Sequence, residues 1–206
     1  MAVTGEAAGV AALQLADWRR RVNAMYTQVR AEPDPATAHA RWRAGRDELF
    51  RTHPQSPLLP DSPLRGTGLP YWPYDPGLRF EVPVEQTEPA QLGIDTASDG
   101  RVGLRRVGVV RIPGLDVQLD VWWLAQYAGG LFLPVRDGTA GAESYGGGRY
   151  LLDTAKGADL GGVADRLILD FNFLYHPSCR YNSAWECPLA PPGNTTAAAL
   201  RGGERL

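Results

Sequence analysis

Hydrophobic residues along this chain follow two different spacings. Near the N-terminus they recur at intervals of three and four, which places them on one face of a helix. The clearest such stripe is Leu15, Trp18, Val22, Met25 and Val29. From Leu78 onward they alternate with polar residues, which is typical of strands with one buried face. The pattern predicts an α+β chain that is mainly β, with its helices first.

Proline marks the limits of two predicted helices. Pro33 ends the first helix, because proline cannot continue a helical ladder. The second helix begins near Asp34 or Pro35, where Asp34 can cap the free amides, and it stops before Pro54. Its charged residues either pair on the surface or include a member that faces a pocket. These residues are Arg43, Arg46, Asp47 and Glu48.

Residues 54–76 combine many prolines with Tyr71, Trp72 and Tyr74. Aromatic side chains need burial, so we expect an ordered strap and not a free linker. The predicted organisation is one structural unit with three parts. These are a helical pair over residues 1–53, the proline-rich strap over 54–76, and an antiparallel β domain over 77–206.

The β domain is predicted from strand-like runs that follow one another closely, with no helical run between them. After the first run at Leu78, the runs are Leu104–Ile112, Leu115–Trp123, Leu131–Val135, Gly148–Leu152 and Leu167–Phe173. Pro113-Gly114 and Gly129-Gly130 supply turns. Such a series is typical of an antiparallel barrel or sandwich. We expect a barrel-like core that carries the two helices and the strap.

Composition restricts the kind of partner. The chain has 206 residues, 44% of them hydrophobic and 21% charged, and a net charge of −2. It lacks the basic face that nucleic acid requires, and no apolar run approaches the roughly 18 residues of a membrane span. Glu6 and Asp17 interrupt any signal segment. We expect a cytoplasmic protein with a small-molecule ligand, no nucleic acid and no membrane, and leave a homodimer open.

A first candidate site lies on the last strand-like runs. Because side chains alternate along a strand, Asp170 and Asn172 point the same way. In the preceding run Arg149 shares a face with Leu151 and Asp153, and it meets Asp170 if the two strands pair. Such a pair either lines a pocket or is a structural ion pair that sets strand register.

A second group surrounds the end of the Leu131–Val135 strand. Arg136 can hold a carboxylate or phosphate, and Glu143 can act as an acid or base if burial raises its pKa. Tyr145 and Tyr150 can donate hydrogen bonds to an oxyanion. The alternative is an ordinary turn, in which Asp137 caps its own loop.

Two further motifs look at first like a cofactor site and a metal site, but their spacing and context argue against both. Gly146-Gly147-Gly148 precedes a strand, whereas a phosphate-binding loop needs a following helix, so we expect a bulge or close backbone approach. His176, Cys179 and Cys187 have spacings unlike those of structural zinc. We expect no cofactor and no metal. The cysteines remain open between free thiols, one of them reactive, a disulfide, and metal ligands.

The same C-terminal region contains several composite motifs. They are Arg136-Asp137-x-Thr139-x-Gly141, Tyr145-Gly-Gly-Gly-Arg149-Tyr150-Leu151, Leu169-Asp170-Phe171-Asn172, and Tyr175-x-Pro177-x-Cys179-x-Tyr181-Asn182 followed by Cys187-Pro188-Leu189. Upstream stand Trp42-Arg43-x-Gly45-Arg46-Asp47-Glu48-Leu49-Phe50 and Gly68-Leu69-Pro70-Tyr71-Trp72-Pro73. With these motifs the chain resembles a bacterial and archaeal family catalogued as domain of unknown function 1684, over nearly all of residues 41–204. The resemblance implies a shared fold and polar cluster, and no settled activity.

The chain departs from the family pattern at three places. His176 stands where members carry asparagine, and Val135 replaces an aromatic residue. Where members read Pro-Pro-x-Glu-Asn-Arg, this chain has Pro191-Pro192-Gly193-Asn194-Thr195. The lost Glu and Arg weaken any reaction that would use them, which points to a specialised branch with an altered pocket.

Together these features predict a cofactor-independent enzyme. It would act on a small organic molecule in a β-barrel pocket by acid/base, cyclisation or hydrolysis chemistry, in secondary metabolism. The predicted catalytic residues are Asp170, Arg149, Glu143 and Asp137, and the predicted substrate-binding residues are Arg136, Tyr145, Tyr150, Asn172 and Tyr181. The alternative is a non-catalytic ligand-binding or interaction module. Convergence of Arg136, Glu143, Arg149 and Asp170 on one open cavity would favour the enzyme, and mutually satisfied pairs would favour the module.

Overall fold

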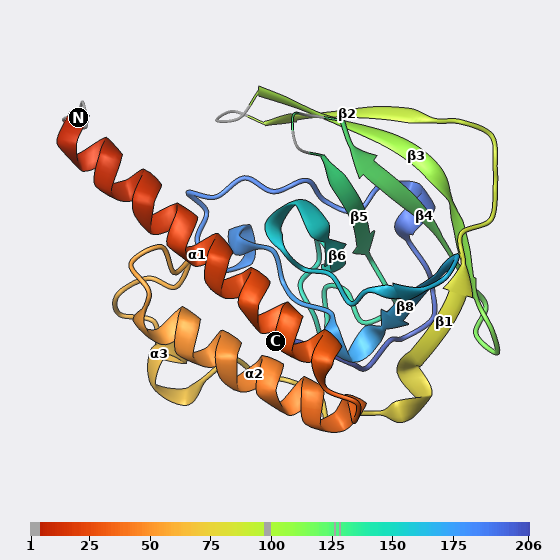
Figure 1. Ribbon diagram of the computed structural model, residues 1–206, viewed down its shortest axis with the longest axis horizontal. Coiled ribbons are helices and arrows are strands. Elements are labelled where there is room, and N and C mark those ends of the chain that lie inside the picture. The colour runs from red at the N-terminus through yellow and green to blue at the C-terminus, as the bar shows by residue number, and fades with distance from the viewer. Residues whose placement is uncertain (1–4, 97–99, 126, 128) are drawn as a thin grey trace.

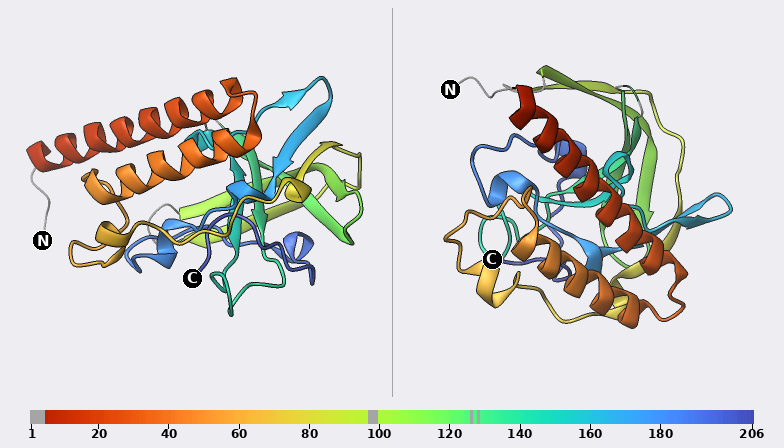
Figure 2. Two further views of the ribbon diagram at one scale, coloured as in Figure 1. Left: turned by 90° about the horizontal axis from the view of Figure 1, so that it is seen from below. Right: turned by 60° about the vertical axis from the view of Figure 1, so that its left-hand side comes forward.

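The computed structural model describes residues 5–96, 100–125, 127 and 129–206 and shows an α+β fold. Helices α1 (Gly5–Ala31) and α2 (Pro35–Thr52) lie side by side as one layer against the strands (Figure 1; Figure 2, left). The short helix α3 (Leu64–Thr67) belongs to the strap. None of the described helices is long and apolar enough to cross a membrane.

The helix limits follow from capping, as predicted. The Asp34 side chain accepts a hydrogen bond from the Thr37 backbone N–H at 2.9 Å, and Pro35 occupies the first turn of α2. Pro33 and Pro54 lie just beyond the ends of α1 and α2, where a helical ladder cannot continue.

Two antiparallel sheets make up the rest of the molecule. The larger has the order β2-β3-β4-β5-β6, with β2 Gln91–Thr96, β3 Gly100–Ile112, β4 Val117–Leu124, β5 Gly130–Val135 and β6 Arg149–Asp153. The smaller has the order β1-β8-β7, with β1 Arg79–Pro83, β8 Arg166–Asp170 and β7 Gly162–Val163. Both sheets lie in the C-terminal part of the chain, where the spacing of two begins.

The described strands form no closed barrel. Single bridges, Glu85 with Val109 and Tyr150 with Tyr175, join the two sheets where a barrel would need continuous ladders. The predicted strand over Leu167–Phe173 ends early, at Asp170, because the Asp170 carboxylate accepts the Asn172 backbone N–H at 3.0 Å and starts a 3-10 turn. β8 therefore ends at Asp170, and it pairs with β1 and β7 and not with β6.

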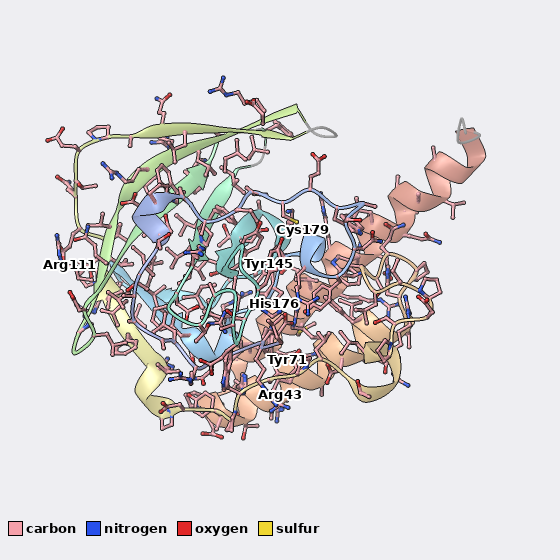
Figure 3. The ribbon with its side chains drawn as sticks, turned by 180° about the vertical axis from the view of Figure 1, so that it is seen from behind. Arg43, Tyr71, Arg111, Tyr145, His176 and Cys179 are labelled. Carbon is pink, nitrogen blue, oxygen red and sulfur yellow. The ribbon has the colours of Figure 1, made fainter. Side chains whose placement is uncertain are left out.

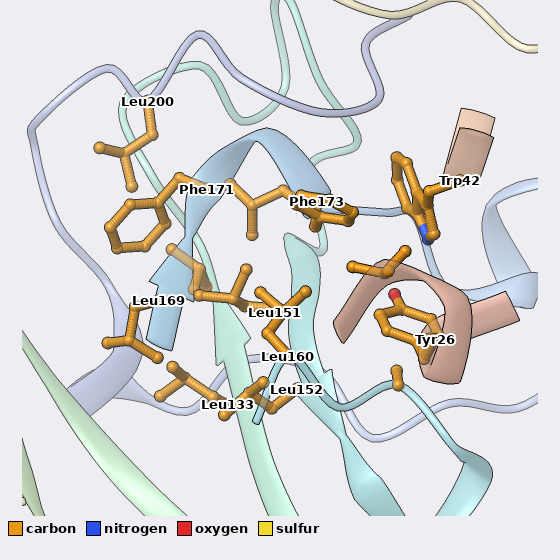
Figure 4. Packing of buried hydrophobic residues seen from close by; sticks show 14 of the residues in the cluster. Tyr26, Trp42, Leu133, Leu151, Leu152, Leu160, Leu169, Phe171, Phe173 and Leu200 are labelled. Atoms are coloured by element: carbon orange, nitrogen blue, oxygen red, sulfur yellow. The ribbon is translucent and has the colours of Figure 1, made fainter. Parts of the chain in front are cut away.

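The main core lies between the helical layer and the sheets (Figure 4). Trp42 of α2 and Tyr26 of α1 are almost fully buried and pack with Phe173 and with Leu151 and Leu152 of β6. The strap adds its own buried side chains, Leu58, Leu69 and Tyr71. These contacts bring α2 and the end of β6 together, and ionisable side chains gather there.

Candidate functional site

A pocket of about 100 Å³ lies where the helical layer meets the end of β6. We call it the helix–sheet pocket. Its walls combine aromatic rings with ionisable groups, as small-molecule sites do. The wall residues that matter for its chemistry are Tyr26, Arg46, Asp153, Lys156, Tyr175 and Cys187.

Asp153, the last residue of β6, is a buried carboxylate in this wall. Paired backbone hydrogen bonds between Asp153 and Ala158, 3.0 Å each, close a tight loop that fixes the backbone at Asp153. Asp153 as a whole is only 2% exposed. Its Oδ2 lies 3.5 Å from Lys156 Nζ, whereas Oδ1 has no hydrogen-bond partner among the described residues. A buried oxygen without a donor costs about 1–3 kcal/mol, so Oδ1 is a site where a ligand would gain a strong hydrogen bond.

Arg46 supplies the opposite charge. Its guanidinium packs against the rings of Trp42, Phe50 and Tyr175, at 4.7 to 5.3 Å from their centroids. Nε and Nη2 both donate to Glu204 Oε1, the first at 2.9 Å. Arg46 also lines the pocket, so a positive charge stands in the same wall as Asp153.

Glu204 is fully buried and accepts hydrogen bonds from several groups around the pocket. Besides Arg46 it accepts the His176 backbone N–H and the Tyr181 hydroxyl, both at 2.7 Å. Burial would raise the pKa of Glu204, but Arg46 and these donors hold it below its ordinary value. Our sequence reasoning missed Glu204, since it stands in a short Gly-Gly-Glu run with no periodicity around it.

The geometry determines which nitrogen of His176 carries the proton. The Tyr145 backbone N–H donates to His176 Nε2 at 3.1 Å, so the proton is on Nδ1, which lies 3.5 Å from Glu204 Oε2. Burial lowers the pKa of His176 to about 4, so the ring is neutral at neutral pH. His176 therefore positions Glu204 and Tyr145. No group of three or more His, Cys, Asp or Glu side chains in the described chain is arranged to hold a metal ion.

Two of the predicted catalytic residues, Arg149 and Asp137, form a buried ion pair outside the helix–sheet pocket. Arg149 pairs with Asp137 at 3.1 Å, not with Asp170, because β6 and β8 belong to different sheets. Arg149 also donates to the backbone carbonyls of Leu200, Gly202 and Glu204 at 2.5 to 2.9 Å. Asp137 accepts the Leu200 N–H at 2.7 Å and the hydroxyl of Thr139 at 2.9 Å. Arg149 and Asp137 thus hold the C-terminal segment, and neither lines the helix–sheet pocket.

The loop after β5 places three other predicted residues near the surface. Arg136 is exposed and donates to the Gly146 carbonyl at 2.9 Å. Glu143 pairs with Arg201 at 2.8 Å on the surface, and the hydrogen bond from Arg201 lowers the pKa of Glu143. Burial was the condition for Glu143 to act as an acid, and that condition is not met. Tyr145 is half-buried behind His176.

The remaining phenols lie beside the pocket. Tyr150 lines it and donates to the Pro188 carbonyl at 2.6 Å. Tyr181 donates to Glu204. Gly148 allows this arrangement by a close backbone approach, as predicted. It has φ of 88°, and a Cβ there would lie 2.7 Å from the Val135 carbonyl oxygen.

Asp170 lines a second pocket of about 90 Å³, between the α1–α2 turn and the β1-β8 edge, and Asn172 lies beside it in the chain. Asp170 accepts the Asn172 side-chain N–H at 2.8 Å, and burial raises its pKa to about 6. Asn172 is fully buried and bonds both backbone polar atoms of Asp75, at 2.7 and 2.9 Å. Asn172 therefore ties the strap to the sheet. Arg136, Glu143, Arg149 and Asp170 do not converge on one cavity.

The known proteins that this chain is similar to are described as having unknown function or as uncharacterized. Residues 66–205 match the family model described as "Protein of unknown function (DUF1684)". Among solved structures, the chain is similar to an uncharacterized protein of Haloarcula marismortui determined by solution NMR. That match has 34% sequence identity and a TM-score of 0.56, and it covers 80% of this chain and 90% of the other. No curated protein matches the chain.

Proposed function

We propose that this chain, which belongs to the DUF1684 family of proteins of unknown function, binds a small polar organic molecule in the helix–sheet pocket and moves a proton on it with Asp153. The observation that carries the proposal is the unpartnered Oδ1 of the buried Asp153 carboxylate in a pocket that also contains Arg46.

The two charges define the ligand class. The positive charge of Arg46 in the pocket wall suits a carboxylate or carbonyl oxygen, and Asp153 Oδ1 suits an O–H or N–H on the same molecule. A small hydroxy acid or amino acid carries both groups. Trp18 and Phe50 add apolar walls that favour a compact carbon skeleton.

The proposed chemistry is proton transfer without a cofactor. Asp153 takes a proton from the bound molecule as a general base. Burial raises the pKa of Tyr175 above its ordinary value, so its hydroxyl stays protonated and can donate to an oxygen on which negative charge develops. Isomerisation, cyclisation and hydrolysis all use such a step. Arg149 and Asp137 contribute by holding the segment that bears Glu204.

The finer parts of our sequence interpretation belong to the same proposal. A barrel-like arrangement of the two sheets remains part of this proposal. A cytoplasmic enzyme of secondary metabolism remains our proposed setting.

The test uses ligand-observed NMR with a panel of small hydroxy acids and amino acids. We expect at least one compound to bind the wild-type chain at millimolar concentration, and Asp153→Asn to weaken its binding about tenfold or more. Glu143→Gln is the matched control, since that carboxylate lies on the surface, and it should bind normally. The proposal is wrong if no panel compound binds, or if Asp153→Asn binds every compound as the wild type does.

The rival function is a non-catalytic binding module. It is favoured by one observation: the charged pairs Arg149–Asp137 and Glu143–Arg201 satisfy each other away from the pocket. A compound that binds wild type and is recovered unchanged, with no exchange of its protons for solvent deuterium, would assign the module.

A further inference from the structure

Tyr26 of α1 is a second residue of the helix–sheet pocket with a buried polar atom that has no partner. The side chain lines the pocket, the residue is 2% exposed, and its hydroxyl makes no hydrogen bond within the described chain. Figure 4 shows its ring projecting from α1 into the core, close to Trp42. Oδ1 of Asp153 is in the same situation and belongs to the same wall. One pocket thus contains two unpartnered buried oxygens, one from α1 and one from β6.

Other polar side chains of this wall do have partners inside the protein. His176 accepts the Tyr145 backbone N–H at 3.1 Å, and these two residues lie close together in Figure 3. Tyr150 donates to the Pro188 carbonyl at 2.6 Å. Buried polar groups are normally hydrogen-bonded, and each exception needs an explanation. We infer from the exception at Tyr26 that a bound molecule supplies the missing partner.

The two unpartnered oxygens differ in the partner that they need. A carboxylate oxygen only accepts hydrogen bonds, whereas a phenol hydroxyl has a proton to donate. Burial is the main cause that raises the pKa of Tyr26 above its ordinary value, and the charges of Arg46 and Asp153 act on the same phenol. Tyr26 is therefore protonated at neutral pH. A group that satisfies both oxygens must donate to Asp153 and accept from Tyr26.

A hydroxyl group meets both requirements, whereas an ammonium group meets only one. A hydroxyl donates and accepts, but an ammonium has three donors and no acceptor. The Asp153 carboxylate also has a cation beside it already, since Lys156 Nζ lies 3.5 Å from Oδ2. A second cation in this buried wall loses its hydration and shares its counter-ion with Lys156, which is unfavourable. A neutral hydroxyl avoids this cost.

We propose that Tyr26 is the specificity-determining residue of the helix–sheet pocket and selects a hydroxy acid over the amino acid with the same carbon skeleton. The ligand hydroxyl donates to Asp153 Oδ1 and accepts from the Tyr26 hydroxyl, while the ligand carboxylate faces Arg46. This inference rests on the proposed function and narrows its two ligand classes to one.

The experiment compares lactate with alanine, and the hydroxy analogue of valine with valine itself, by ligand-observed NMR at neutral pH. We expect the wild type to bind at least one hydroxy acid about tenfold more tightly than its amino counterpart. Tyr26→Phe should remove this preference by weakening hydroxy acid binding about tenfold, with amino acid binding unchanged. It should also keep or raise the midpoint of urea unfolding, because it removes a buried hydroxyl that has no partner in the free protein.

Tyr71→Phe is the matched control. The Tyr71 hydroxyl is also buried and without a hydrogen bond in the described chain, but Tyr71 belongs to the strap and does not line the pocket. Its ring lies beside Arg43 in Figure 3, with the guanidinium 4.6 Å from the ring centre. This variant should likewise keep or raise the unfolding midpoint, and it should retain the preference for the hydroxy acid.

The possible results separate this inference from the proposed function. The inference is overturned if the amino acids bind as tightly as the hydroxy acids. It is also overturned if Tyr26→Phe binds every compound as the wild type does, which would assign the Tyr26 hydroxyl to a water molecule only. In both cases binding that is weakened by Asp153→Asn leaves the proposed function standing, whereas failure of every compound to bind removes both.

Discussion

Asp170 is a carboxylate whose charge state depends on its burial. Burial raises its pKa from an ordinary value of 3.8 to about 6. Between these values the folded chain retains a proton that the unfolded chain has released. The free energy of unfolding therefore falls as pH rises through this window. At about 1.4 kcal/mol per pKa unit, the effect has an upper limit of roughly 3 kcal/mol.

Asp170→Asn should remove this pH dependence. Asparagine can still accept the Asn172 backbone N–H, which Asp170 accepts at 3.0 Å, so the turn after β8 is kept. Urea unfolding at several pH values between about 4 and 7 measures the change, and the variant should gain about 2 kcal/mol relative to wild type at the upper end. Asp116→Asn, at an exposed turn, is the control. An unchanged pH profile in Asp170→Asn would contradict the assigned burial effect.

Between elements, the ion pair of Arg46 with Glu204 joins α2 to the C-terminal segment at residues 195–206. Both side chains are buried, so removing one partner leaves the other charged and unpaired. Glu204→Gln should lower the free energy of unfolding by about 3–5 kcal/mol. The exposed pair Arg201–Glu143 is the matched control, and Glu143→Gln should cost less than about 1 kcal/mol.

A double variant separates pairing from packing. Arg46→Met with Glu204→Leu removes both charges together, so it should be less destabilised than Glu204→Gln alone. Chemical denaturation of the variants gives the comparison. Equal losses in Glu204→Gln and Glu143→Gln would show that burial of this pair has no energetic consequence.

For the whole molecule, the C-terminal segment connects parts of the chain that are far apart in sequence. Its backbone bonds the strap at Trp72, the loop after β5 at Gly138 and the segment after β8 at Leu174, with distances of 2.8 to 3.0 Å. Arg149 secures it with three further bonds to carbonyls. This segment therefore completes the fold between the strap and the sheets.

Deletion of residues 200–206 should abolish the cooperative unfolding transition. It removes Glu204 from Arg46 and leaves Arg149 buried without its carbonyl partners. Circular dichroism across a urea titration measures the loss. Leu13→Gln on the exposed part of α1, where Leu13 is 70% exposed, should leave the transition unchanged. A cooperative transition in the shortened chain would show that the strap and sheets fold without this segment.

Local patterns predicted the elements well. The spacing of Leu15 to Val29 predicted α1, Asp34 and Pro35 predicted the start of α2, and alternation from Leu78 predicted the β region. The resemblance to DUF1684 is confirmed. The strand expected through Phe173 was wrong beyond Asp170, because one side-chain cap to Asn172 outweighed the alternating pattern.

The sequence by itself determined the two long helices, most strands, the antiparallel α+β class and the family, because each depends on neighbours within a few residues or on a whole motif. Only the tertiary structure decided which charges meet. Arg149 pairs with Asp137 and not with Asp170, and Arg46 pairs with Glu204, 158 positions away. Sheet order sets the first of these pairings and the C-terminal segment the second. The physical reason is that burial and long-range contact set the charge and availability of a polar group, and neither is encoded in local spacing.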